Sequence, residues 1–300
     1  MIRRILMASA GAFALTGAAF AADLPSRAPP PVFLPPPPLW TGFYLGINAG
    51  YEWSASTGIN TATANVFSLP ALNGNIGGAV ATLATGNHSL NPNGFIGGGQ
   101  IGYNYQFANS WVAGLEADFD GIAGAHRVGS VGQTGFVPGA AVPIADSSII
   151  TWRKSVNYLG TVRGRIGYLV TPTLLIYGTG GLAYGGVNAS TGVVEQLGFG
   201  DTPSPFGTFG SISSTRVGWT AGGGAEWMFL PNWSAKVEYL YYDLGNATYR
   251  SALPQFGNLG TLLETIGVTR TSTHFNGNVV RVGLNYHFSW GAPAPVVAKY

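Results

Sequence analysis

Hydrophobic and polar residues alternate one by one along residues 40–53, WTGFYLGINAGYEW. Phe43, Leu45 and Ile47 fall on one side of an extended chain, whereas Asn48 and Glu52 fall on the other. Successive side chains of a strand point to opposite faces, so the pattern predicts a β-strand with one apolar and one polar face.

The same alternation returns in seven further segments, residues 95–107, 111–122, 152–169, 174–187, 216–229, 233–242 and 279–288. Four long stretches rich in Gly, Ser, Thr, Asn and Pro separate them in pairs, at residues 55–94, 123–151, 188–215 and 245–277, and the other connections are only three or four residues. Short turns at one end and long loops at the other are typical of outer-membrane barrels. The expected fold is all-β, an eight-stranded antiparallel transmembrane up-and-down β-barrel with long extracellular loops and short periplasmic turns.

The distribution of charge supports a membrane location. Charged residues make up 9% of the chain, against roughly a quarter in soluble domains. On the predicted polar faces lie six acids and six bases: Glu52, Glu116, Asp118, Asp120, Glu226 and Glu238, with Arg153, Arg163, Arg165, Arg216, Lys236 and Arg281. A Lys or Arg that faces lipid at the bilayer midplane costs about 2–4 kcal/mol. We therefore expect these twelve side chains to form a charge network in the barrel interior, either structural or pore-lining, and only Lys154, near a loop end, breaks the alternation.

The N-terminal segment predicts export. Arg3 and Arg4 precede an apolar run, and Ala19-Phe20-Ala21 supplies the small residues of a cleavage site, so residues 1–21 are expected to be a signal peptide. Residues 22–39 are rich in proline and predict a periplasmic linker. The barrel is then expected over residues 40–288, followed by a periplasmic tail over residues 289–300. Without the two signal arginines, twelve basic residues balance twelve acidic ones, which predicts no nucleic-acid partner.

Motifs for enzyme chemistry are weak. The chain has no cysteine, and residues 97–102 match GxGxxG inside a predicted strand, where that motif cannot bind a dinucleotide. His88, His126, His274 and His287 are scattered without the spacing of a metal site. Asp118 and Asp120 share a face and could act as an acid–base pair, but pairing with interior arginines is the preferred interpretation. We expect no catalytic, cofactor-binding or metal site, no cofactor and no enzymatic activity.

The first-strand motif WTGFYLGINAGYEW after a Pro-rich start, the internal LLIYGTGGLAYGGV and the final Tyr286-His287-Phe288 carry a family resemblance. The chain resembles the porin-like outer-membrane β-barrel family of alphaproteobacteria, which includes outer-membrane immunogenic proteins. The resemblance implies an OmpA-like barrel folded by the outer-membrane assembly machinery, with the last strand as the assembly signal. The residues of that signal are Val280, Val282, Leu284, Tyr286 and Phe288. Because SWGAPAPVVAKY follows Phe288, the signal would be internal.

Three functions remain open at this point. An eight-stranded barrel has an interior just wide enough for side chains, so the leading hypothesis is a structural and surface-interaction protein of the Gram-negative outer membrane. A low-conductance porin that passes small solutes or ions is the alternative, and a lipid-modifying enzyme has the least support. The expected partners are outer-membrane lipid and lipopolysaccharide and the assembly machinery, and the Pro-rich start or the tail could contact peptidoglycan. The ligands of the loops are unknown.

Overall fold

The computed structural model describes residues 40–65, 75–141, 143–199, 202–256 and 263–288. The predicted signal peptide, linker and C-terminal tail lie outside these residues. The elements are β1 (Gly42–Ser54), β2 (Gly58–Asn65), α1 (Ile76–Leu83), β3 (Gly86–Ser89), β4 (Asn93–Phe107), β5 (Trp111–Ala123), β6 (Arg127–Phe136), β7 (Ala145–Thr171), β8 (Leu174–Phe199), β9 (Thr202–Leu230), β10 (Trp233–Phe256) and β11 (Leu263–His287). No helix among the described residues is long and apolar enough to cross a membrane.

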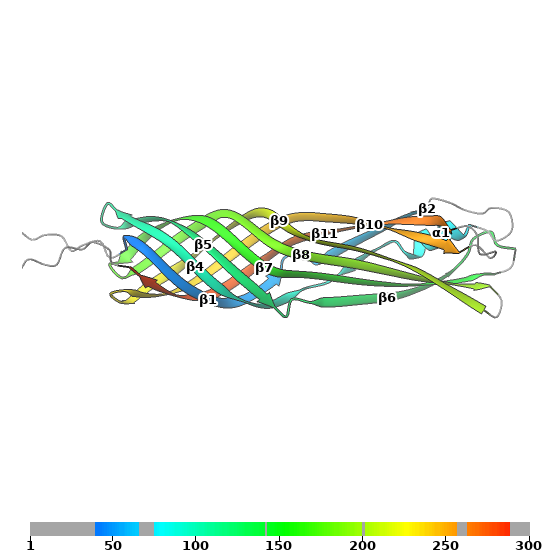
Figure 1. Ribbon diagram of the computed structural model, residues 1–300, viewed down its shortest axis with the longest axis horizontal. Coiled ribbons are helices and arrows are strands. Elements are labelled where there is room, and N and C mark those ends of the chain that lie inside the picture. Colours follow the sequence, from blue (N-terminus) through cyan, green and yellow to red (C-terminus); the bar gives the residue numbers. More distant parts are fainter. Residues whose placement is uncertain (1–39, 66–74, 142, 200–201, 257–262, 289–300) are drawn as a thin grey trace, which may run out of the picture. The chain divides into compact units, whose positions relative to one another are not determined.

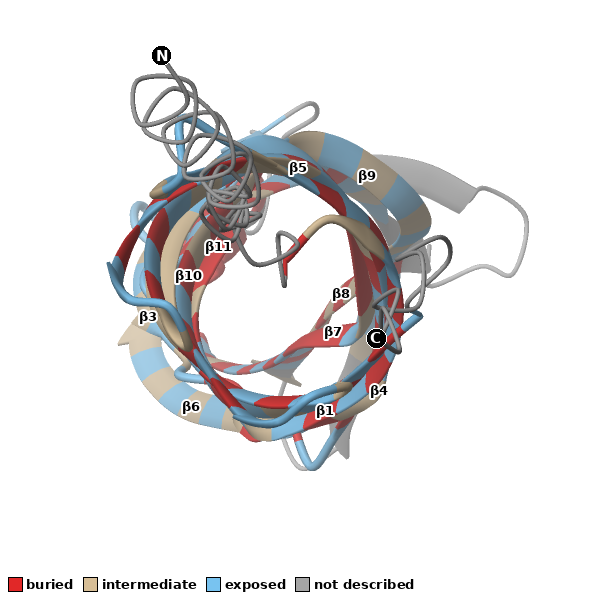
Figure 2. Ribbon diagram, turned by 90° about the vertical axis from the view of Figure 1, so that its left-hand side faces the viewer, coloured by how far each residue is buried: buried red, intermediate tan, exposed pale blue. Residues whose placement is uncertain are grey.

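Eight strands close into a ring (Figure 2). Their order is β1, β4, β5, β7, β8, β9, β10 and β11, all neighbours are antiparallel, and β11 pairs back with β1 from Tyr44↔His287 to Ser54↔Gly277. Closure leaves no free strand edge around this ring, which is the condition for crossing a bilayer with strands. The structure confirms the predicted eight-stranded antiparallel barrel.

Side chains alternate between the outside and the interior of this ring. On β1, Leu45 and Ile47 are 54% and 67% exposed, whereas Tyr44, Asn48 and Glu52 are buried. The outward row is apolar and bounded by aromatic side chains at both ends, such as Tyr168 and Tyr158 on β7. An apolar outer band with aromatic borders matches the lipid-facing surface of a transmembrane barrel.

One β-bulge overturns two predicted orientations. The pairing of β7 with β8 slips between Val156 and Tyr158, and the inserted residue reverses which side chains face inward. Arg153, predicted to face the interior, is therefore exposed on the outside. Val156, which strict alternation with the outward Tyr158, Val162 and Ile166 would place on the lipid side, is buried inside. Lys154 is also buried inside. Its position breaks the alternation expected from the sequence because the bulge shifts the strand by one residue before Tyr158.

The long connections are largely β-structure. Strands β7 to β11 have 24 to 29 residues each, more than twice the roughly 9–11 residues that span a bilayer. Together with β6, β2 and β3 they continue beyond the apolar band on the side opposite the short turns, and α1 lies against this continuation (Figure 1). We call it the extension. Segment 188–215, predicted as a loop, lies almost entirely in β8 and β9. Its Gly, Ser and Thr residues are interspersed with residues that favour strands, such as Val193, Val194 and Phe209.

Glycines make room for aromatic rings on the strand surfaces. A Cβ at Gly102 in β4 would overlap the ring of Tyr44, and a Cβ at Gly186 in β8 would overlap the ring of Tyr158. The GxGxxG stretch lies within β4, as predicted. The high glycine content therefore has a packing explanation in which bulky rings lie flat against neighbouring strands.

Candidate functional site: the barrel interior

The centre of the barrel interior holds nine charged side chains in mutual contact, which we call the charge layer. They are the acids Glu116, Asp118, Asp120, Glu226 and Glu238 and the bases Arg163, Arg165, Lys236 and Arg281. All nine are at most 4% exposed. They come from β5, β7, β9, β10 and β11, so strands on opposite sides of the ring meet in one layer.

Arg163 and Arg281 lie at the centre of this layer and share the acids Asp118 and Glu238. Arg163 contacts Glu116 at 2.5 Å, Asp118 at 2.8 Å and Glu238 at 3.0 Å. Arg281 contacts Asp118 at 2.6 Å, Asp120 at 2.6 Å and Glu238 at 2.7 Å. Because each guanidinium has five donors in a planar fork, one arginine can bridge several carboxylates. The two arginines therefore tie the acids of β5 to Glu238 of β10.

Lys236 and Arg165 extend the layer toward the short-turn end. Lys236 Nζ lies 2.9 Å from Glu116 Oε1, and Arg165 pairs with Glu226 at 2.7 Å. The Arg165 guanidinium also lies over the rings of Tyr44 and Tyr177, at 5.2 and 4.7 Å from the ring centres. Glu226 accepts a further hydrogen bond from Ser234 at 2.6 Å. Each of these charges therefore has an opposite charge in contact, which matters because an unpaired buried charge is strongly destabilising.

Three of the twelve predicted network residues lie outside these contacts. Arg153 is on the outer surface, as described above. Arg216 is half-buried, and its Nε has no hydrogen-bond partner within the described residues. Glu52 is buried but accepts its hydrogen bond from Tyr242 at 2.6 Å instead of pairing with a base of the layer. The other nine form the charge layer.

Apolar side chains fill the interior on the short-turn side of the charge layer. Trp40 is fully buried and packs with Val112, Leu169, Leu175, Tyr177 and Met228. Its Nε1 donates a hydrogen bond to the Pro172 carbonyl at 3.0 Å, and its ring meets His287 edge-on. Trp40 therefore reaches across the interior at this end of the barrel, from the turn between β7 and β8 to β11. The tryptophan begins the motif that defined the first strand, but its inward position could not be read from strand alternation because it precedes β1.

A second and larger apolar cluster fills the interior on the other side of the charge layer. It comprises Ile96, Ile122, Ala125, Val156, Leu159, Ala183, Val187, Ala189, Leu240, Tyr242, Leu244, Ala247, Tyr249, Phe275 and Val279. Lys154 is next to this cluster, 5.2 Å from the centre of the Phe275 ring, and its Nζ donates to the carbonyls of Ser56 and His274 at 2.7 Å each. Sequence reasoning missed this cluster because it treated the interior face of every strand as polar.

The extension has its own apolar core and two buried acids. Ala79, Val80 and Ala84 at α1 pack with Ile150, Trp152 and Val193 among others. Nearby, Asp146 and Glu195 are buried, and Ser148 donates a hydrogen bond to Glu195 at 2.7 Å. Burial raises the pKa of Asp146 to about 6 and that of Glu195 to about 8.

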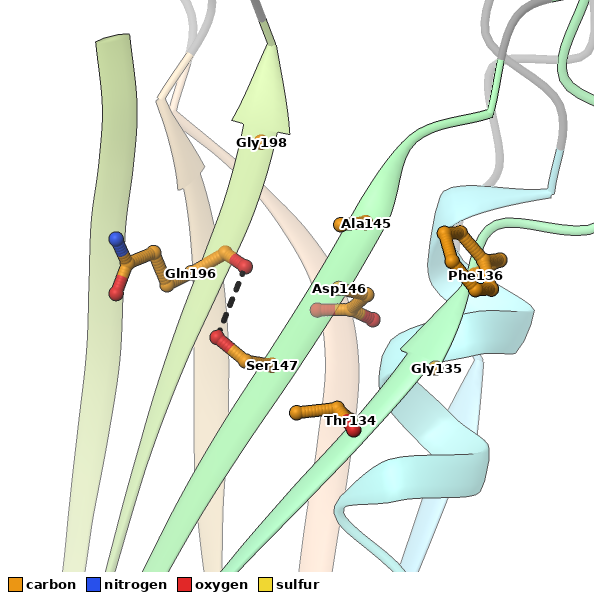
Figure 3. A pocket seen from close by; sticks show the side chains of 8 residues that line it. All are labelled: Thr134, Gly135, Phe136, Ala145, Asp146, Ser147, Gln196 and Gly198. Atoms are coloured by element: carbon orange, nitrogen blue, oxygen red, sulfur yellow. Dashed lines mark hydrogen bonds between the residues drawn. The ribbon is translucent and has the colours of Figure 1, made fainter. Parts of the chain in front are cut away.

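A hollow of about 400 Å³ lies at the outer end of the extension (Figure 3). Strands β6, β7 and β8 line it, with Phe136 on β6 and Asp146 on the middle strand β7. Across it, Ser147 donates a hydrogen bond to the Gln196 carbonyl at 3.4 Å. No group of three or more His, Cys, Asp or Glu in the described part of the chain is arranged to hold a metal ion.

The predicted assembly-signal residues face outward along β11 and just beyond it. Val280, Val282, Leu284, Tyr286 and Phe288 are 36–61% exposed. The Phe288 N–H donates a hydrogen bond to the Phe43 carbonyl at 2.9 Å, which ties this end of the chain to β1.

Comparison with known proteins gives a consistent result. A family model described as outer membrane protein beta-barrel domain matches residues 10–288. A 31 kDa outer-membrane immunogenic protein of Brucella melitensis is 33% identical over 96% of this chain and 100% of that protein. A 25 kDa outer-membrane immunogenic protein of Brucella abortus is 25% identical over 96% of this chain and 99% of that protein. Among solved structures, the outer membrane protein OprG from Pseudomonas aeruginosa is 10% identical, with a TM-score of 0.35, over 83% of this chain and 96% of that one.

Proposed function

Since the chain belongs to the family of outer membrane β-barrel proteins, we propose that it is a closed barrel with a structural and surface-interaction role and without enzymatic activity. Its location is the outer membrane of a Gram-negative bacterium. The single observation that carries the proposal is the order of layers in the interior. A fully buried charge layer lies between two apolar clusters.

This order of layers disfavours a porin. Water and ions need a continuous polar path, whereas here Trp40 and its neighbours fill one end and the cluster around Leu159 and Phe275 fills the other. The charges between them are paired with one another and leave few sites for a passing ion. Such an arrangement fits a rigid barrel that links strands across its interior and stiffens the membrane-spanning part.

Transport through refolded liposomes tests the closure. We expect liposomes that contain the folded barrel to swell no faster in arabinose or KCl than liposomes without protein. A matched pair of variants sharpens the test: Trp40→Ala removes one apolar closure, and Trp233→Ala removes an outward tryptophan of similar size. Solute-dependent swelling of the unmodified protein would instead establish the low-conductance porin.

The outer surface of the extension supports a surface-interaction role. Phe136, Ile149 and Val194 are 70%, 53% and 47% exposed on the neighbouring strands β6, β7 and β8, and Ile149 pairs directly with Val194. Exposed apolar side chains gathered on neighbouring strands mark surfaces that contact other molecules. The enzyme hypothesis has no comparable support, because the interior acids are ion-paired instead of facing a substrate cavity.

Surface labelling tests which end is presented outside the cell. Because the chain has no cysteine, Ser130→Cys on β6 and Thr171→Cys at a short turn each introduce a unique thiol. We expect a membrane-impermeant maleimide to label the Ser130→Cys variant in intact cells, and the Thr171→Cys variant only after the outer membrane is permeabilised. The reverse pattern would contradict the proposed orientation.

A further inference from the structure

Arg153 points outward from β7 and places a cationic side chain beyond the apolar band. The bulge between Val156 and Tyr158 is the cause, and bulges commonly re-aim a side chain at functional surfaces. Arg153 is exposed, and it makes no hydrogen bond or ion pair with the described residues. The Arg153 guanidinium is therefore available to bind an anionic group from outside the protein.

Arg153 belongs to a hollow of about 410 Å³ on the outer face of β6 to β9. Directly paired residues of neighbouring strands face the same side, and the pairs Val128↔Arg153, Arg153↔Ser190 and Ser190↔Ser211 form one continuous row across the sheet. A second row, which includes Asn188↔Ser213, runs beside it. The hollow is therefore built on regular strands and has a fixed geometry.

The lining of this hollow is rich in hydrogen-bond donors and positive charge. His126, Arg127, Arg153, Ser190, Ser211 and Ser213 line it, and no Asp or Glu does so among the described residues. Arg127 begins β6 and pairs with Lys154, so it lies beside the Arg153 row and not in it. Its side chain is nevertheless exposed, lines the hollow and donates to Asn93 Oδ1 at 2.9 Å, which leaves its other donors available. Guanidinium and hydroxyl groups are the donors that phosphate oxygens accept from most readily.

The height of the hollow above the lipid band matches a lipid headgroup. Tyr158 marks the outer border of the band on β7, and Arg153 follows five residues further along the strand. At roughly 3.3 Å per residue along a tilted, bulged strand, Arg153 lies about 10 Å beyond that border. The headgroup region occupies the first several ångströms outside the hydrocarbon, and a long arginine side chain can reach back toward it.

We propose that the hollow around Arg127 and Arg153 binds a phosphate group carried by a lipid of the outer leaflet. The proposal goes beyond the closed-barrel function and rests only on the outer-membrane location, so a silent or a conducting barrel would leave it unchanged. An acidic peptide could also meet two arginines. The lipid is favoured because the hollow continues the same outer face that the apolar band presents to the membrane.

Binding by the full refolded protein in dodecylmaltoside micelles tests the proposal. The probes are bis-phosphorylated lipid A, lipid A from which both phosphates have been removed, inorganic phosphate and a poly-glutamate peptide. We expect the phosphorylated lipid to bind at least about tenfold more tightly than the dephosphorylated one. Tighter binding of inorganic phosphate than of lipid A would mean that the lipid is not the ligand, and preferential binding of poly-glutamate would overturn the proposal in favour of a protein partner.

Substitutions assign the binding to this hollow. We expect Arg153→Gln and Arg127→Gln each to weaken binding of lipid A several-fold, and the double variant to remove the preference for the phosphorylated form. Arg153→Lys keeps the charge and is expected to retain part of the affinity. Arg250→Gln is the matched control, since Arg250 is an exposed arginine of the extension outside the hollow. Heat-dependent gel mobility confirms folding of each variant, and equal lipid A affinity in the folded double variant and the unmodified protein would overturn the assignment.

Discussion

The membrane-spanning part and the extension use the same strands but stabilise their interiors differently. In the spanning part the interior centre is polar, and every charge of the charge layer has an opposite charge within contact distance. In the extension the interior is apolar around α1, and its buried acids Asp146 and Glu195 have no basic partner within the described residues. The outer faces also differ, because the outer face of the spanning part is apolar, whereas that of the extension mixes polar side chains with exposed apolar ones such as Phe136 and Ile149. The solvent outside the barrel thus determines which side of each strand can carry charge.

Removing a base from the charge layer should have the largest effect on this contrast. In the variant Arg281→Met, Asp118, Asp120 and Glu238 lose a shared partner, and we expect a loss of about 3–5 kcal/mol in the free energy of unfolding. Urea-dependent unfolding in lipid vesicles measures it. Arg270→Met, an exposed position on the same strand, is the control. A loss below about 1 kcal/mol would mean that the ion pairs are not coupled to folding.

Adding a charge to the lipid-facing side of the same strand should cost slightly less. Val282 is adjacent to Arg281 and is 61% exposed on the outside. Val282→Arg would place a cation in the apolar band at a cost of about 2–4 kcal/mol, whereas Val282→Ala should change stability by much less. The same unfolding assay compares the two variants. Tolerance of Val282→Arg would contradict the assigned orientation of β11.

A cavity in the extension should have a local effect. Val80 of α1 is buried in the apolar core of the extension, and Val80→Ala should destabilise this core by about 2 kcal/mol. Hydrogen exchange is the measurement. We expect faster exchange in α1 and β6 and no change in β1, whose closed ring does not depend on the helix. Equal acceleration in β1 would show that the two parts unfold as one unit.

The buried acids should give the extension a modest pH dependence. Because burial raises the pKa of Glu195 to about 8 and that of Asp146 to about 6, the folded extension binds more protons than the unfolded chain between about pH 4.5 and 8. Its stability should therefore fall as the pH rises through this range. Hydrogen exchange at pH values from 5 to 9, corrected for the intrinsic exchange rate, measures the trend.

The variant Glu195→Gln separates this effect from others. Glutamine cannot ionise, so we expect a weaker pH dependence and greater protection of the extension near pH 9. Glu264→Gln, on the long strand β11, provides the control substitution. A pH dependence that is unchanged by Glu195→Gln would show that this carboxyl does not ionise within the range.

The sequence predicted the spanning part well because one rule governs it. Lipid outside and polar side chains inside force strict alternation, so the spacing alone placed nine of the twelve proposed charges in the charge layer and Glu52 elsewhere in the interior. Arg153 was placed wrongly because a bulge shifts the alternation by one residue and leaves no clear mark in the sequence. The strands of the extension were read as loops because water on the outside relaxes the requirement for apolar residues. The apolar closures were missed because Leu, Tyr and Val on an interior face look like any other strand residues.

Single-channel recording of the refolded protein in planar bilayers tests the closed interior most directly. We predict that the folded barrel, verified by heat-dependent gel mobility, produces no discrete conductance steps in 1 M KCl. Discrete steps that change in size with Glu116→Gln or Arg163→Gln would contradict this account, because they would show that ions pass through the charge layer.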